Sequence, residues 1–227
     1  SEDGNLWHLS HEGGLLEDPA NETPNDIFKT SVPPEQAPNK SEYVEIEFEC
    51  GTPVKINGKK LSPAKVIETL NAIGARNAIG QVDLVENRLV GMKSRGVYET
   101  PGGAILYFAH RKLESLTLDK ETMHYKQIIA LKYGEMVYNG QWFTPLKEAL
   151  DAFVDSTQRF VTGRVKIKLY KGTIRPASIT SPYSLFRGDI ATFGKSLEYS
   201  HSDATGFLRL YGLPVKICAG VHKKINK

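Results

Sequence analysis

The stretch VENRLVGMKSRGVYETPGG, residues 85–103, gathers side chains that could hold a small charged molecule. Glu86 lies where the preceding apolar alternation ends, and binding groups often lie at strand ends and in the loops beyond them. A carboxylate there can pair with an ammonium group, while the Tyr98 hydroxyl can both donate and accept a hydrogen bond. These two residues predict a pocket for a small zwitterion. The competing interpretation is an internal salt-bridge network that holds two layers of the fold together.

Two cations in the same stretch, Lys93 and Arg95, also have two interpretations. They could bind an anion as charge-assisted donors, or they could hold the loop in place, and we favour the second role. No side chain is a convincing general base, so we assign no catalytic residue. His11 has no second histidine three or four positions away, so we assign no metal ligand. The sequence also lacks the glycine-rich motifs that bind nucleotide phosphates.

Composition narrows the class of protein. The chain has 227 residues, of which 40% are hydrophobic and 24% charged, as is typical of a globular protein with a substantial core. A net charge of +3 gives no indication of a nucleic-acid or membrane partner, and no apolar run reaches the roughly 20 residues of a membrane helix. Cys50 and Cys218 are the only cysteines, which favours a reducing cytoplasm.

The first half of the chain predicts a polar segment followed by strands. Residues 1–42 are polar and contain several prolines, which excludes a long helix and favours a segment that wraps a surface. YVEIEFEC, residues 43–50, alternates strictly and predicts a half-buried strand with Cys50 on the inward face. Asn57-Gly58 between short alternating arms predicts a tight hairpin.

Helices and strands alternate irregularly after the hairpin. Ser62 followed by Pro63 predicts a helix start. Residues 81–91 predict a strand leading into the polar stretch, and residues 104–116 predict a helix after it.

Two more helices are predicted to begin after Asp119 and at Thr144-Pro145. For the first we expect one inward face, and we expect its tyrosines to be core residues (Tyr125, Ile128, Ile129, Tyr133, Met136, Val137). For the second we also expect an inward face (Leu146, Ala149, Leu150, Phe153, Val154).

The last elements are a hairpin and a helical tail. Residues 164–170 alternate and turn at Lys171-Gly172 into a partner strand over 173–180. Residues 203–225 predict a helix capped by Asp203, with at least one break because of its glycines and proline. This order predicts an α+β fold with a mixed or largely antiparallel sheet packed by helices, and a projecting C-terminal helical segment.

Several stretches together resemble argininosuccinate synthase. They are GNLWHLSHEGGLLEDP near the start, VENRLVGMKSRGVYETPGG about seventy residues later, and SPYSLFRGDIATF and SDATGFLRLYGL near the end. The similarity runs over essentially the whole chain and keeps the motifs in order. It implies that this sequence is the C-terminal part of that enzyme, and we expect a preceding nucleotide-binding domain with an SGGxD loop to lie outside it.

The resemblance implies an ATP-dependent ligase that joins citrulline to aspartate through a citrullyl-adenylate, a step of arginine biosynthesis. Matching motif to motif implies that Ser1, Ser10, Glu86 and Tyr98 contact citrulline. ATP, with Mg²⁺, and aspartate would bind mainly to the preceding domain.

The resemblance also implies a division of the chain. Residues 1–202 would form the citrulline-binding synthetase domain, with 1–42 as the wrapping segment. Residues 203–227 would form the tail of a homotetramer, since an isolated helix would expose apolar side chains (Phe207, Leu208, Leu210, Leu213, Ile217). The alternatives are a freestanding amino-acid-binding or assembly module without catalysis, and a divergent ligase for another amino acid.

Overall fold

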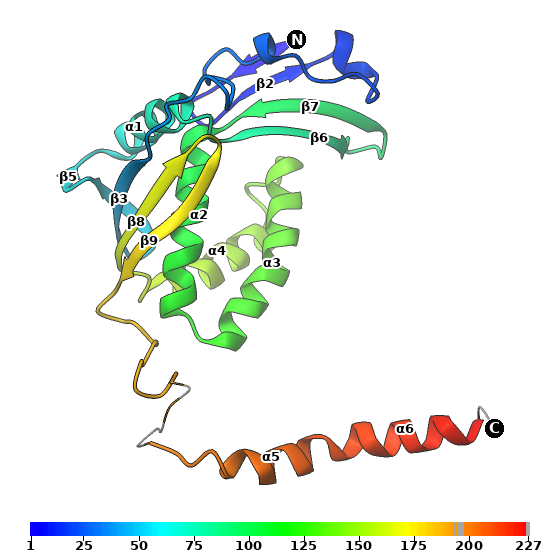
Figure 1. Ribbon diagram of the computed structural model, residues 1–227. Coiled ribbons are helices and arrows are strands. Elements are labelled where there is room, and N and C mark those ends of the chain that lie inside the picture. Colours follow the sequence, from blue (N-terminus) through cyan, green and yellow to red (C-terminus); the bar gives the residue numbers. More distant parts are fainter. Residues whose placement is uncertain (193, 195–197, 226–227) are drawn as a thin grey trace. The chain divides into compact units, whose positions relative to one another are not determined.

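The computed structural model describes residues 1–192, 194 and 198–225 of the chain. The chain divides into two compact units, residues 1–185 and 186–227. The first unit contains two separate antiparallel sheets and four long helices, and the second contains the two C-terminal helices (Figure 1). The predicted α+β class with antiparallel sheets is thereby confirmed.

The five-stranded sheet carries the main core. Its strand order is β5-β4-β3-β8-β9, with every neighbouring pair antiparallel. The bounds are β3 Glu42–Glu49, β4 Thr52–Ile56, β5 Lys59–Lys60, β8 Gly163–Tyr170 and β9 Thr173–Thr180. Side chains alternate along β3 and β8, so one face of the sheet is apolar and fully buried (Val44, Ile46, Phe48, Val165, Ile167, Leu169).

Two helices cover this apolar face. They are α1, Pro63–Arg76, and α2, Pro101–Thr117 (Figure 1). The side chain of Ser62 accepts a hydrogen bond from the Lys65 N–H, which confirms the predicted cap of α1. Both helices contribute to the same hydrophobic cluster (Val66, Leu70, Ile73, Ile105, Leu106, Ala109, Leu113). The opposite face of the sheet is exposed.

The four-stranded sheet has the order β1-β2-β7-β6 and is antiparallel throughout. Its strands are β1 Glu2–Gly4, β2 Leu9–Glu12, β6 Gln81–Asn87 and β7 Lys93–Glu99. The predicted polar loop is therefore largely a strand, because β6 and β7 form a hairpin that turns at Gly91, whose φ is +86°. The segment between β2 and β3 contains two short 3-10 helices, η1 Gly14–Glu17 and η2 Asn25–Ile27.

Helices α3, Lys120–Tyr138, and α4, Pro145–Gln158, pack on each other, and their caps are Asp119 and Thr144 as predicted. Their predicted inward faces are partly wrong. On α3 only Met136 is buried, whereas Tyr125 is 57% and Ile128 65% exposed. On α4, Leu146 is exposed and Lys147 is buried instead. The reason is that the main hydrophobic cluster contains no residue of α3 or α4, so neither helix has to bury a complete apolar face.

Two further sequence predictions need correction. Cys50 does not face the core: it is exposed, has a φ of +47° and lies in the turn after β3. Ser202, not Asp203, precedes the first turn of α5.

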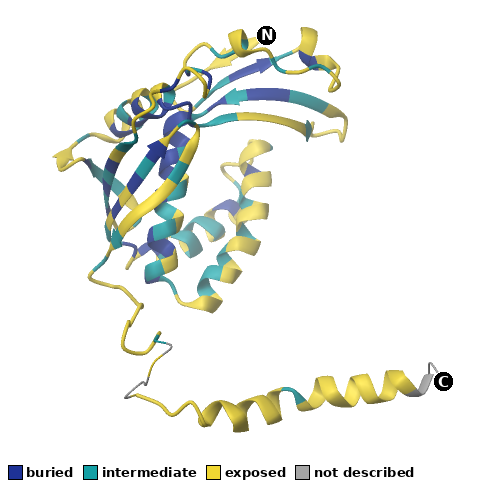
Figure 2. Cartoon of the chain, viewed as in Figure 1, coloured by how far each residue is buried: buried dark blue, intermediate teal, exposed yellow. Residues whose placement is uncertain are grey.

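The second unit contains α5, Asp203–Tyr211, and α6, Leu213–Ile225. The predicted helical tail is confirmed, and its predicted break falls at Gly212. Figure 2 shows that both helices are exposed over almost their whole described length. Among the described residues, no helix is long and apolar enough to cross a membrane.

Candidate functional site

The two faces of the four-stranded sheet differ sharply in their surroundings. Successive side chains on a strand point to opposite faces. Ser10 on β2 lies opposite Tyr98 on β7, and Tyr98 lies opposite Val82 on β6. Ser10, Tyr98 and Glu86 therefore project from one face, which we call the open face. His11, Arg95 and Glu99 project from the other, which the segment between β2 and β3 covers.

On the open face, the Tyr98 hydroxyl donates a hydrogen bond to Oε1 of Glu86 at 2.5 Å. The two residues come from neighbouring strands of the hairpin, and the phenol reaches Glu86 by lying along its own strand over Gly96. A Cβ at Gly96 would lie only 2.6 Å from the Tyr98 oxygen. The glycine is therefore a steric requirement of the pair, because any larger residue would displace the phenol.

The two predicted serines lie on the same face as this pair. The Ser10 hydroxyl donates to the Asp3 carbonyl at 3.2 Å, and Ser10 is the register partner of Tyr98. The backbones of Ser1 and Glu12 bond each other reciprocally, at 2.8 and 3.0 Å, which continues the β1–β2 ladder. The structure thus brings all four predicted residues onto one face of one sheet, while their role in binding stays a prediction.

The open face is negatively charged. Burial, the hydrogen bond to Glu86 and the nearby carboxylates of Glu86 and Glu12 all raise the pKa of Tyr98 above its ordinary value. The phenol therefore keeps its proton and donates a hydrogen bond to Glu86, so the phenol oxygen can accept a hydrogen bond from a ligand. Tyr138, at the end of α3, also acts on Tyr98, and Figure 1 shows that end of α3 beside the hairpin.

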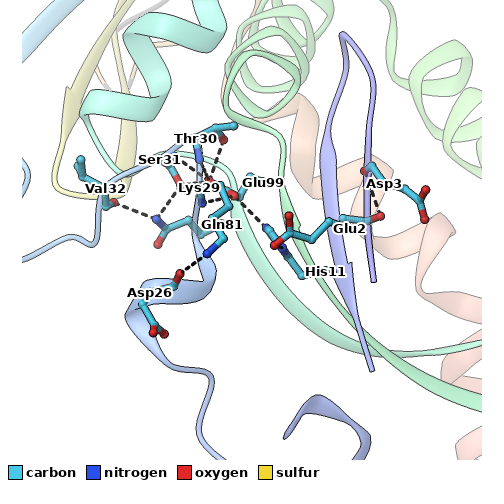
Figure 3. Close-up of polar contacts among 11 residues, drawn as sticks. Glu2, Asp3, His11, Asp26, Lys29, Thr30, Ser31, Val32, Gln81 and Glu99 are labelled. Carbon is cyan, nitrogen blue, oxygen red and sulfur yellow. Dashed lines mark hydrogen bonds and ion pairs between the residues drawn. The ribbon is translucent and has the colours of Figure 1, made fainter. Parts of the chain in front are cut away.

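The covered face is organised around Glu99, which is 1% exposed. Its Oε1 accepts from the Lys29 N–H at 2.8 Å, and its Oε2 accepts from both the backbone and the hydroxyl of Thr30 and Ser31, at 2.7 to 2.9 Å. Nε2 of His11 lies 2.9 Å from Oε1. Figure 3 shows these groups converging on one carboxylate from two other segments of the chain, β2 and residues 29–31.

Burial alone raises the pKa of Glu99, but the hydrogen bonds from Lys29, His11, Ser31 and Thr30 outweigh it and lower the pKa to about 2. The carboxylate is therefore ionised, so His11 Nε2 carries the proton of their hydrogen bond. The other ring nitrogen of His11 is buried without a hydrogen bond, and Glu2 lies 3.5 Å from it.

Arg95 and Lys93 lie on the covered side of the register, away from Tyr98. The Arg95 guanidinium binds Asp83 at 2.8 and 2.9 Å, the carbonyls of Asp18 and Asn21, and the Thr23 hydroxyl. The contacts of Arg95 with Asp18, Asn21 and Thr23 tie the wrapping segment to the sheet. Lys93 is exposed at the start of β7.

Sequence reasoning missed three residues of this region: Glu99, Glu12 and His8. Glu12 lies opposite Gly96 on the open face, and the His8 ring packs edge-on against Tyr98 with centroids 5.8 Å apart. The alternation of LSHE and of KSRGVYE would have separated the two faces, but only if the stretch had been interpreted as a strand. Glu99 also needs partners about seventy residues away, which no local pattern indicates.

Metal ions in proteins are held by clusters of histidine, cysteine and acidic side chains. Nowhere in residues 1–192, 194 and 198–225 do three histidine, cysteine or acidic side chains come together in a way that could hold a metal ion.

Fold and site together define an α+β domain in which an antiparallel sheet presents carboxylates and hydroxyls on an open face. The family model described as "Arginosuccinate synthase C-terminal domain" matches residues 1–218. The chain belongs to this family.

Similar individual proteins support the same family assignment. Argininosuccinate synthase from Carboxydothermus hydrogenoformans is 63% identical over 227 residues, 100% of this chain and 57% of that protein. The enzyme from Desulforamulus reducens is 61% identical over 224 residues, 99% of this chain and 56% of that protein. The enzyme from Caldanaerobacter subterraneus subsp. tengcongensis is 63% identical over 219 residues, 96% of this chain and 53% of that protein. The chain therefore spans little more than half the length of the curated relatives it matches.

Proposed function

We propose that this chain is the C-terminal part of a cytoplasmic argininosuccinate synthase, and that the open face of its four-stranded sheet forms part of the citrulline site. The complete enzyme would condense citrulline with aspartate at the expense of ATP, in arginine biosynthesis. The observation that supports this best is the Tyr98–Glu86 pair, which lies beside Ser10 on a face that carries a second carboxylate, Glu12.

The open face suits the amino-acid end of citrulline. An α-ammonium group can pair with the Glu86 carboxylate and donate to the Tyr98 oxygen, whose own hydrogen is already engaged. The Ser1 hydroxyl can donate to the α-carboxylate, and the Ser10 hydroxyl can do so by releasing the Asp3 carbonyl. Fixing the charged end in this way would orient the neutral ureido group toward the reacting phosphate, which is catalysis by positioning.

The other substrates are assigned to the rest of the enzyme. ATP with Mg²⁺, and aspartate, would bind mainly outside this chain. The ureido oxygen would attack the α-phosphorus of ATP and release pyrophosphate, and the aspartate amine would then attack the ureido carbon and displace AMP. The residues described here orient citrulline and do not act as a general base. We also propose that residues 203–227 contribute to a homotetramer.

The test is a pair of substitutions in the complete enzyme. Glu86→Gln keeps the shape of the side chain but removes its charge, so we expect the KM for citrulline to rise by about tenfold or more, the equivalent of a charged hydrogen bond. Tyr98→Phe keeps the ring but loses the hydroxyl and should raise the same KM by a smaller factor. The KM values for ATP and aspartate should change little.

Glu45→Gln is a matched control, because Glu45 is an acid on the outward face of β3 and belongs to the other sheet. It should leave every KM unchanged. A citrulline KM that is the same in Glu86→Gln as in the unmodified enzyme would remove Glu86 from the site. In addition, this chain alone should form no argininosuccinate from citrulline, aspartate and ATP, and product from the pure chain would contradict the division of roles.

A further inference from the structure

A second polar concavity lies on the outward face of the five-stranded sheet, far along the chain from Glu86 and Tyr98. It has a volume of about 340 Å³ and is lined by five residues, Ser41, Lys168, Tyr170, Thr173 and Arg175. Ser41 immediately precedes β3, and the other four flank the turn between β8 and β9. We call this concavity the β8–β9 recess.

The charges at the recess are unusual for a strand pair. Lys168 and Arg175 are direct register partners. Like charges directly opposite each other on neighbouring strands are destabilising. Neither of them forms an ion pair with a carboxylate in the part of the chain that the structure describes, and no acidic residue lines the recess.

Three cations of β4 and β8 on the same sheet face lie beside carboxylates. Lys55 binds Glu47 at 2.8 Å, and Arg164 lies 3.9 Å from the same carboxylate. Lys166 is the register partner of Glu45. Lys168 and Arg175 differ from these three cations, because among the described residues neither has a carboxylate as ion-pair or register partner.

The walls of the recess are firmly placed. The Gly172 N–H donates to the Asn77 carbonyl at 2.8 Å, which fixes the β8–β9 turn against the end of α1. The Lys168 ammonium lies 5.8 Å from the centre of the Tyr43 ring, a cation–π contact that limits its mobility. Two hydroxyls add to the polar lining: Ser41 and Tyr170 can each donate to a ligand.

We propose that the β8–β9 recess binds a phosphate group, free or as part of a small phosphorylated molecule. A dianion would remove the repulsion between Lys168 and Arg175. The planar guanidinium can bind two phosphate oxygens at once, while the ammonium and the hydroxyls bind the others. The volume lies at the lower end of the range for small-molecule sites, which suits a compact ligand. The proposal does not depend on the citrulline site.

The experiment uses inorganic phosphate as the probe. The ¹⁵N-labelled chain is titrated at constant ionic strength while backbone amide shifts are followed by NMR. We expect saturable shifts confined to the amides of residues 168–175 and of Ser41. The double variant Lys168→Gln/Arg175→Gln should weaken the apparent affinity by about tenfold or more, since each lost donor is a charge-assisted hydrogen bond. Arg175→Gln alone should weaken the apparent affinity by an intermediate factor, and this single variant provides the test if the double variant does not fold.

The matched control is Arg164→Gln/Lys166→Gln, which removes the same charge from β8, at two positions that lie opposite carboxylates on β3. It should bind phosphate like the unmodified chain. Equal weakening in both double variants, or shifts that do not saturate, would overturn the proposal and indicate general ionic attraction. Equal binding of acetate, a monoanion, would also overturn it. Titration with a ribonucleoside monophosphate distinguishes the two sources: additional shifts beyond the recess indicate a phosphorylated molecule, and identical shifts indicate free phosphate.

Discussion

At the scale of single residues, Tyr98 and Glu99 are adjacent in β7, and their side chains point to opposite faces of the four-stranded sheet. Tyr98 points to the open face and bonds Glu86, while Glu99 points into the buried network that ties down residues 29–31. Ser10 and His11 repeat this division on β2, where His11 bonds Glu99. The buried network thus fixes the register of the two strands that place Ser10 beside Tyr98.

Replacing Gly96 tests the placement of the phenol. In Gly96→Ala the new methyl would lie 2.6 Å from the Tyr98 oxygen, so the ring must move and its bond to Glu86 must break. We expect the citrulline KM of the complete enzyme to rise about as much as in Tyr98→Phe. Ser94→Ala, two residues away on the same strand face, is the control and should have little effect. Normal kinetics for Gly96→Ala would show that the phenol position does not matter for binding.

The lowered pKa of Glu99 predicts how the stability of the fold depends on pH. Its pKa in the folded chain is about 2, below the ordinary value of 4.5. A lowered folded pKa contributes stability that is complete above the ordinary value and is lost as the pH falls toward the folded value. The contribution at neutral pH is on the order of 3 kcal/mol, since one pKa unit corresponds to about 1.4 kcal/mol.

The measurement compares urea unfolding of the chain and of Glu99→Gln at several pH values between 7 and 3. In the variant, the amide NH₂ group would face the N–H and O–H donors of residues 29–31, so the free energy of unfolding should be about 3 kcal/mol lower than in the unmodified chain at pH 7. This difference should shrink below pH 4.5. The ring of His11 and the carboxylate of Glu2 lie near Glu99 and are the same in both proteins. A difference that stays constant down to pH 3 would contradict the ionised, hydrogen-bonded state of Glu99.

At the scale of elements, close packing of α1 on α2 depends on glycine. A Cβ at Gly102 would lie 2.5 Å from Oδ1 of Asn71 and 3.1 Å from the carbonyl of Ile67, both on α1. The Asn71 side chain also accepts a hydrogen bond from the Gly102 N–H at 2.8 Å. No side chain larger than hydrogen fits without separating the two helices.

The same substitution should therefore have opposite effects in two helices. Gly102→Ala should lower the free energy of unfolding by about 1–3 kcal/mol through overpacking. Gly134→Ala, in the middle of α3 with open space around its Cβ position, should raise it by up to about 1 kcal/mol through helix propensity. Urea unfolding of both variants measures whether each substitution lowers or raises the free energy of unfolding. Stabilisation by Gly102→Ala would mean that α1 and α2 are not in close contact.

At the scale of the whole molecule, the exposed apolar residues of the tail need a partner. Phe207 is 61%, Leu210 75% and Val215 71% exposed. Apolar surface of this kind marks an interface. Under the proposed function, the partner is another subunit of the same enzyme.

The oligomeric state of the complete enzyme tests this role. Phe207→Ser/Leu210→Ser should shift the mass measured by light scattering from a tetramer toward smaller species, because buried apolar contacts are lost. Lys216→Ser, a polar change within the same tail, should leave the mass unchanged. A tetramer that persists in the double variant would assign the interface to another surface.

Local patterns in the sequence determined the elements and the main core. Strict alternation in residues 43–49 and 164–170 produced β3 and β8 with buried Val44 and Ile167, and Ser62, Asp119 and Thr144 began helices as expected. These signals depend on residues within a few positions of each other, where side-chain period and capping dominate. The resemblance to a family supplied Ser1 and Ser10, which no local pattern would have selected.

Only the tertiary structure decided which surface each element presents. The carboxylate of Glu99 is stabilised by donors from residues 29–31, and Arg95 is engaged by residues 18–23, both far away in the sequence. Whether Tyr125 is buried depends on how many neighbours surround α3, which amphipathic periodicity does not specify. Periodicity fixes which side chains share a face, but the free energy of burying that face depends on contacts between distant segments.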